Sequence, residues 1–127
     1  MKFLGIDYGR KKIGLATSEG MLAEPLKVIR FEKIEEALTK VEQVVRTEST
    51  EKVIIGISEG KMGEETREFA RKLKEKISVE VVFQDETLST QSAQELSLIA
   101  NVKRKKRKEM EDAYSAAIIL QNYIDGV

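Results

Sequence analysis

The feature that most limits how this chain can fold is an unbroken apolar stretch, Val53-Ile54-Ile55-Gly56-Ile57. A strand with one face in water alternates apolar and polar residues, and this stretch does not. Continuous apolar strands are typical of parallel sheets that are covered on both faces. The stretch therefore predicts an α/β fold in which a central parallel strand lies between two layers of helices.

The rest of the chain supplies partners for this strand. The short turn at residues 9–11 predicts an N-terminal antiparallel hairpin, and apolar residues at helical spacing predict helices that pack on the sheet. At 127 residues, with no internal repeat, the chain is expected to form a single domain over 1–127. The expected strands are 2–8, 12–17, 26–30, 53–57 and 79–84, a flexible loop is expected at 58–63, and the expected helices are 33–48, 64–77, one from the Thr/Ser-rich 87–92 to about 99, and 109–124.

The residue types that are missing restrict the chemistry. With no His and no Cys, the chain can build neither Ser–His or Cys–His nucleophile pairs nor Cys/His zinc sites. A catalytic metal would need oxygen ligands, which favours Mg²⁺ or Mn²⁺. Acid–base chemistry would fall to carboxylates, Lys, Tyr or metal-bound water.

Three of the four Asp residues fall at the ends of expected elements. Asp7 ends the first strand, and Asp85 ends the fifth strand beside Glu86, which points to the opposite face. Asp112 heads an apolar stripe on the last helix. Each acid has a structural reading, as a turn cap, a helix cap or a complement to the helix dipole.

A mixed sheet could bring these acids to one edge, where ligands collect in folds of this kind. Carboxylates so close together repel one another unless a cation joins them. The cluster therefore predicts a bound divalent metal, and two such ions about 4 Å apart can clamp the attacking and leaving oxygens of a phosphodiester.

The basic residues are unevenly placed although the net charge is zero. Six of them are consecutive, from Lys103 to Lys108, and such a block is usually a solvated loop and sometimes a phosphate-binding patch. The expected nucleic-acid contacts are Arg10, Lys11, Lys61, Lys103, Arg104, Lys105, Lys106, Arg107 and Lys108.

Several short motifs follow one another in a recognisable order along nearly the whole chain. These are Gly5-Ile6-Asp7-Tyr8-Gly9 with Ile13-Gly14-Leu15-Ala16, the loop after Ile57 with Gly63, Asp85-Glu86, the basic block, and Asp112 followed by Ala116-Ala117-Ile118-Ile119-Leu120. Together they resemble the YqgF or RuvX family, the Holliday-junction-resolvase-like nucleases of the ribonuclease H-like superfamily.

The resemblance implies a ribonuclease H-like fold, with a five-stranded mixed sheet of order 3-2-1-4-5 and helices on both faces. It implies that Asp7, Asp85, Glu86 and Asp112 are catalytic, and we expect Asp7, Glu86 and Asp112 to ligate Mg²⁺ or Mn²⁺. The chain departs from the family's usual pattern at two places. Gly56-Ile57-Ser58 replaces Gly-Leu-Pro, and Asp85-Glu86-Thr87 replaces Asp-Glu-Arg, which removes an arginine from the edge of the site.

The acids and the missing residue types favour metal-dependent endonuclease cleavage of structured nucleic acid. The resemblance implies 5′-end maturation of pre-16S rRNA as the first expected activity, with branched DNA second. The missing arginine and neutral charge favour an alternative, a non-catalytic nucleic-acid or ribosome-associated binding module. A phosphate binder of the sugar-kinase or actin-like type would need two such domains. The protein is expected to be a cytoplasmic monomer or homodimer that can associate with a ribosomal subunit, since no apolar run is long enough for a membrane helix and no signal peptide is recognisable.

Overall fold

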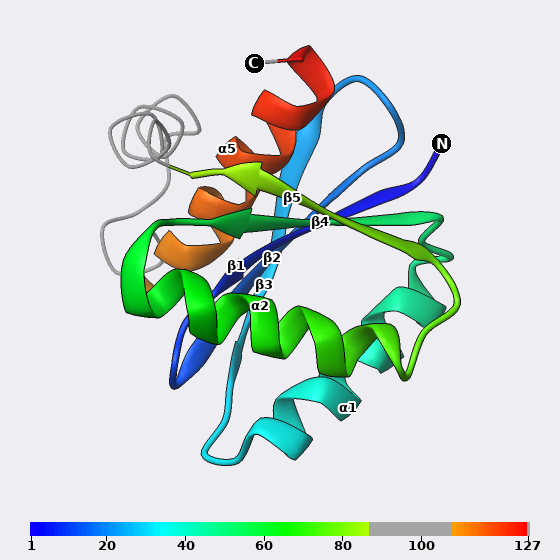
Figure 1. Cartoon of the computed structure of the whole chain (residues 1–127). Helices are drawn as coiled ribbons and strands as arrows, with labels where there is room; N and C mark the ends of the chain where they lie inside the picture. Colours follow the sequence, from blue (N-terminus) through cyan, green and yellow to red (C-terminus); the bar gives the residue numbers. More distant parts are fainter. Residues whose placement is uncertain (87–107, 127) are drawn as a thin grey trace.

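The structure is a computed structural model that describes residues 1–86 and 108–126 (Figure 1). The predicted helix between about 87 and 99 and most of the basic block lie outside these ranges. The described elements, in chain order, are β1 Phe3–Tyr8, β2 Lys12–Ser18, β3 Ala23–Arg30, α1 Ile34–Thr47, β4 Lys52–Ile57, α2 Gly60–Lys74, β5 Glu80–Asp85 and α5 Glu111–Asp125.

The described strands form one five-stranded sheet in the order β3-β2-β1-β4-β5. β1 and β2 form the predicted antiparallel hairpin, β3 pairs antiparallel with β2, and β4 lies parallel to both β1 and β5. This confirms the predicted strand order and the parallel setting of the apolar stretch in β4.

Helices cover both faces of the sheet, as predicted. In Figure 1, α1 and α2 lie on one side of the sheet and α5 lies on the other. Because side chains alternate along a strand, Leu4 and Ile6 of β1 join the core under α1 and α2, whereas Gly5 lies against Leu120 of α5. We call the second side the α5 face. None of the helices within the described ranges is long and apolar enough to cross a membrane.

Three predicted boundaries are wrong by three residues or more. One is the end of α2, which lies at Lys74 instead of residue 77. β3 begins at Ala23 instead of residue 26, so Pro25 lies inside it, which is tolerated because β3 is an edge strand with an unpaired side. α2 begins at Gly60 instead of residue 64, so most of the predicted loop is its first turn. Gly63 packs directly against the Ser58 carbonyl, which leaves no room for a Cβ, so the first turn contains a glycine despite its low helix propensity.

Candidate active site

Asp7 lies near the end of β1, on the α5 face, opposite Gly14 of β2. Burial raises the pKa of its carboxyl to about 7, and the nearby charges of Glu86 and then Asp112 act in the same direction. A hydrogen bond between the Asp7 and Glu86 side chains also favours the protonated form. The predicted acids Asp7, Glu86 and Asp112 therefore interact electrostatically at one place.

Glu86 reaches this place because the β4–β5 ladder continues past β5. Its backbone N–H donates a hydrogen bond to the Ile57 carbonyl at 3.1 Å. Its side chain lies over Gly56 of β4, where an added Cβ would be 3.0 Å from Glu86 Oε2 and would collide with Ile119 of α5. A residue larger than glycine at position 56, near the end of β4, would force Ile119 and the Glu86 carboxylate to shift.

Asp112 comes from the first turn of α5 and is bound by a cation from the sheet. Lys12 Nζ lies 3.1 Å from Asp112 Oδ2, and the Asp112 side chain is 29% exposed. The helix approaches β2 so closely that a Cβ on Gly14 would collide with the Asp112 backbone carbonyl. Gly14 and Lys12 therefore position Asp112, and neither was predicted as a site residue. The available signal was that Gly5, Gly14 and Gly56 fall at α5-face positions of three adjacent strands.

The arrangement provides oxygen donors from three separate elements. Oxygen-only donor sets suit Mg²⁺ and Mn²⁺, and clustered carboxylates with a raised pKa are the electrostatic condition that a divalent cation relieves. As the side chains stand in the described residues, no three carboxylates are close enough together to hold an ion. Asp7 hydrogen-bonds Glu86, and Asp112 pairs with Lys12, so a proton and an ammonium group balance charge there.

Asp85 lies apart from these three acids. It shares the strand face of Val81, which belongs to the core under α1 and α2, and its residue is exposed. Its charge is not among the causes that raise the pKa of Asp7. Of the adjacent predicted acids Asp85 and Glu86, the structure therefore brings only Glu86 to Asp7.

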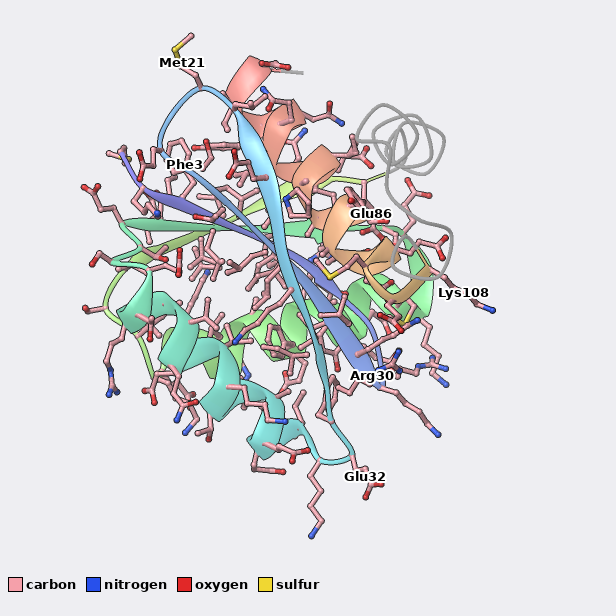
Figure 2. All side chains as sticks on the ribbon, turned by 180° about the vertical axis from the view of Figure 1, so that it is seen from behind. Phe3, Met21, Arg30, Glu32, Glu86 and Lys108 are labelled. Atoms are coloured by element: carbon pink, nitrogen blue, oxygen red, sulfur yellow. The ribbon has the colours of Figure 1, made fainter. Side chains whose placement is uncertain are left out.

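The predicted basic contacts divide into two groups. Arg10 donates hydrogen bonds to both carboxylate oxygens of Glu65 on α2, with Nε 3.0 Å and Nη2 2.9 Å from Oε2, so it joins the hairpin to α2. Lys11 at the hairpin tip, Lys61 in the first turn of α2 and Lys108 are exposed. Figure 2 shows Lys108 and Glu86 on the same side of the view. The predicted contacts Lys103, Arg104, Lys105, Lys106 and Arg107 lie outside the described residues.

Comparison with known families and sequences gives one consistent match. A family model described as RuvX, Holliday junction resolvase, matches residues 1–126. A Desulforamulus reducens protein named "Putative pre-16S rRNA nuclease" is 38% identical over 98% of this chain and 97% of its own length. A protein of the same name from Syntrophomonas wolfei is 37% identical over 99% of this chain and 95% of its own length.

Comparison with solved structures identifies the fold. A Thermus thermophilus RuvC bound to a Holliday junction superposes with a TM-score of 0.68 at 17% identity, covering 99% of this chain and 96% of that one. The fowlpox virus resolvase in complex with Holliday junction DNA gives a TM-score of 0.69 at 12% identity over 99% and 98%. At these identities the likeness shows a shared ribonuclease H-like resolvase fold.

Proposed function

This chain belongs to the RuvX family and is a nuclease, and from that membership we propose that it is a divalent-metal endonuclease acting on structured nucleic acid. Its first proposed substrate is the 5′ region of pre-16S rRNA, because the relatives at 37–38% identity carry that name over nearly their whole length. Branched DNA is the second proposed substrate, supported by the description of the family.

One observation supports the metal site most strongly. Asp7, half-buried near the end of β1, has a pKa raised to about 7 by desolvation and by the charges of Glu86 and Asp112. Three half-buried acids, two of which raise the pKa of the third in this way, are unfavourable for a protein that does not use them. We therefore propose Asp7, Glu86 and Asp112 as the ligands of Mg²⁺ or Mn²⁺.

When bound, a divalent cation supplies Lewis-acid polarisation of the phosphodiester and a lower pKa for the attacking water. Asp7 must lose its proton to act as a ligand, so its raised pKa ties metal binding to pH. Lys12 holds Asp112 at the start of α5, and Gly14 and Gly56 let α5 and Glu86 approach the sheet. These residues fix the acids on rigid elements, which is what positioning of a reacting phosphate requires.

The test compares cleavage of a labelled pre-16S rRNA fragment and a labelled four-way DNA junction, each with Mg²⁺, with Mn²⁺ and with chelator. We expect metal-dependent cleavage of the RNA, and none by Asp7→Asn. Asp125→Asn is the matched control, since it removes an exposed carboxylate at the far end of α5. Cleavage that persists in chelator, or in Asp7→Asn at the wild-type rate, would overturn the proposed metal site.

The alternative of a non-catalytic binding module keeps one specific observation in its favour. The chain has Thr87 where the family usually has an arginine after the acidic pair. Binding of both probes without cleavage of either, in Mg²⁺ and in Mn²⁺, would support that module and contradict the enzyme.

A further inference from the structure

Two cationic residues are direct neighbours on adjacent strands, on the same face of the sheet and next to the candidate active site. Lys12 of β2 and Arg30 of β3 are direct Cα partners. Their neighbours Ile13 and Ile29 both belong to the core under α1 and α2, so Lys12 and Arg30 project from the α5 face. Directly opposed residues have Cβ atoms about 5 Å apart, and like charges in such a pair destabilise the sheet. The fold therefore accepts a local electrostatic cost at this position.

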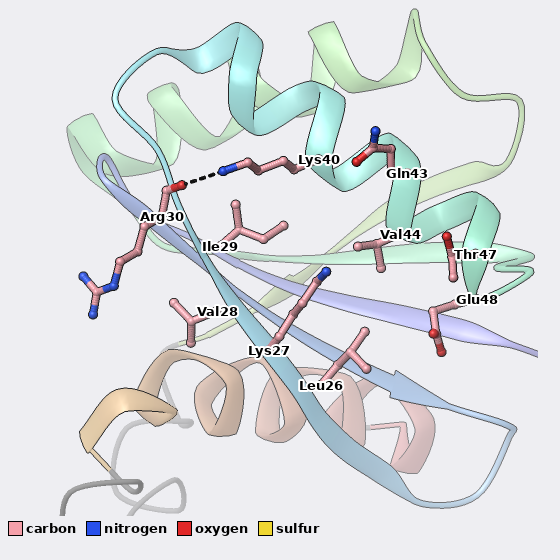
Figure 3. Close-up of a pocket in the computed structure, with 10 residues that line it drawn as sticks. All are labelled: Leu26, Lys27, Val28, Ile29, Arg30, Lys40, Gln43, Val44, Thr47 and Glu48. Atoms are coloured by element: carbon pink, nitrogen blue, oxygen red, sulfur yellow. Dashed lines mark hydrogen bonds between the residues drawn. The ribbon is translucent and has the colours of Figure 1, made fainter.

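In the described part of the chain, this repulsion is relieved for Lys12 only. Lys12 pairs with Asp112, whereas within residues 1–86 and 108–126 no ion pair involves the Arg30 side chain, which is exposed. The backbone carbonyl of Arg30 accepts a hydrogen bond from Lys40 Nζ at 3.2 Å. Figure 3 shows the Arg30 side chain extending away from α1, while Lys40 reaches the carbonyl.

The backbone of a third cationic residue, Lys11, is held beside this pair. The Phe31 N–H donates to the Lys11 carbonyl at 3.0 Å, which ties the end of β3 to the hairpin tip. Lys11 and Arg30 line one hollow at this edge together with Arg10, Phe31 and two carboxylates, Glu32 and Glu36. Glu36 is paired with Lys40 at 3.8 Å. The Arg30 side chain on the α5 face is thus left available to an anion, and Lys11 lies beside it at the hairpin tip.

The sheet register gives the distance from this cluster to the acids. Asp7, Gly14 and Val28 form one row across β1, β2 and β3, and Arg30 lies two residues further along β3. With strands about 4.8 Å apart and a rise of about 3.3 Å per residue, the Asp7 and Arg30 Cα atoms are about 12 Å apart. A phosphate at Arg30 is therefore a neighbour of the phosphate at the carboxylates, and not the same group.

We propose that Arg30, with Lys12 and Lys11, forms a second phosphate subsite that binds the nucleic-acid backbone beside the cleaved bond. The inference rests on the proposed nuclease function, which supplies the polyanion. A phosphate between Lys12 and Arg30 would receive charge-assisted hydrogen bonds and remove their mutual repulsion. Arg30 is a positioning residue in this account, since it contacts backbone and carries no sequence preference.

The test measures binding of the four-way DNA junction and of a single-stranded RNA 12-mer in chelator, where cleavage does not interfere. We compare Arg30→Gln with Lys27→Gln, which removes the same charge from an exposed position of the same strand on the other face. Losing one phosphate contact should weaken binding by roughly tenfold at low salt and reduce the slope of log affinity against log salt by about 0.7 to 0.9. Lys27→Gln should stay within about twofold of the wild type.

A second variant separates binding from folding. Arg30→Glu places a carboxylate opposite Lys12, so we expect a higher thermal midpoint together with weaker binding than Arg30→Gln. A residue needed only for the fold would lose both together. In metal-dependent cleavage, Arg30→Gln should raise KM by about tenfold and change kcat less than KM.

The outcomes of the two proposals are distinguishable. If Arg30→Gln binds as tightly as Lys27→Gln while the enzyme still cleaves with metal, the subsite is overturned and the nuclease proposal stands. A salt slope that depends on Arg30, without metal-dependent cleavage, would support the subsite and overturn the nuclease. If Arg30→Gln weakens binding of the junction alone, the subsite binds a phosphate of the strand opposite the cleaved one. If it weakens binding of both probes, the subsite binds a phosphate of the cleaved strand. A wild type that binds neither probe would overturn both proposals.

Discussion

Ionisation of the Asp7 carboxyl costs free energy in the folded protein. Its pKa is about 7 in the metal-free folded protein and near 3.8 when unfolded, so the folded state holds the proton more tightly. Stability from this group is therefore complete below about pH 4 and is lost as the pH rises towards 7. Bound metal reverses this preference, because a cation favours the ionised carboxylate.

The first prediction concerns this pH dependence. In chelator, Asp7→Asn should be more stable than the wild type at pH 8, by about 1 to 3 kcal/mol, because a shifted pKa corresponds to about 1.4 kcal/mol per unit and removing a clustered charge relieves repulsion. The difference should shrink towards pH 4, where Asp7 is protonated. Urea unfolding at pH 4.5, 6 and 8 measures it, with Asp125→Asn as the control. Equal stability of the wild type and Asp7→Asn at pH 8 would mean that Asp7 ionises without cost.

The second prediction separates two adjacent acids. Glu86 lies on the face of Asp7, whereas Asp85 lies on the face of Val81. Glu86→Gln should reduce metal-dependent cleavage by at least about 100-fold, since even outer-shell partners of metals affect activity by about 10 to 100-fold. Asp85→Asn should change it by no more than a few fold. Equal losses in single-turnover cleavage would restore the prediction from sequence that both acids are catalytic.

At the scale of elements, close contact between α5 and the sheet places Asp112. The third prediction uses two glycines under the same helix. Gly14→Ala pushes on the backbone of the first turn of α5 at Asp112, and Gly5→Ala pushes on the Leu120 side chain further along it. Both should cost about 1 to 3 kcal/mol in urea unfolding, as overpacked cores do.

The two glycine variants should differ in metal affinity. Gly14→Ala displaces the turn that carries Asp112, so it should weaken Mn²⁺ binding more than Gly5→Ala at matched stability. The reverse order, measured by calorimetry, would mean that the position of α5 against β2 does not set the geometry of the acids.

Elements with strong local patterns could be predicted from sequence, and elements shaped by tertiary contact could not. The apolar run predicted β4 and the helical spacing predicted α1, each with the right type of element and with ends within a residue or two. The start of α2 was missed because Gly60 and Gly63 are typical of a loop, whereas here Gly63 packs against the Ser58 carbonyl inside the first turn of the helix. Likewise, Asp7, Glu86 and Asp112 were predictable as acids at element ends, whereas the roles of Lys12 and Gly14 depend on the packing of α5 against β2.

At the scale of the whole molecule, a neutral chain must bind a polyanion through local charge. The fourth prediction concerns the basic block, for which Lys105, Lys106 and Arg107 are changed to Ala together. Binding to every sequence should weaken alike, and the slope of log affinity against log salt should fall by about 2 to 3. Cleavage at saturating substrate should survive. An unchanged slope would make the block a solvated loop and leave Lys11, Lys61 and Arg30 as the contact surface.

The central claim is that Asp7, Glu86 and Asp112 form one metal site, and proton release on metal binding tests it most directly. Mn²⁺ is titrated calorimetrically at pH 6 in two buffers of different ionisation enthalpy, with wild type, Asp7→Asn, Asp112→Asn and Asp125→Asn. The wild type and Asp125→Asn should release close to one proton per bound ion, because Asp7 is mostly protonated below its pKa of about 7. Asp7→Asn should release almost none, and both site variants should bind at least about tenfold more weakly. Equal affinity and equal proton release in all four proteins would contradict the shared site.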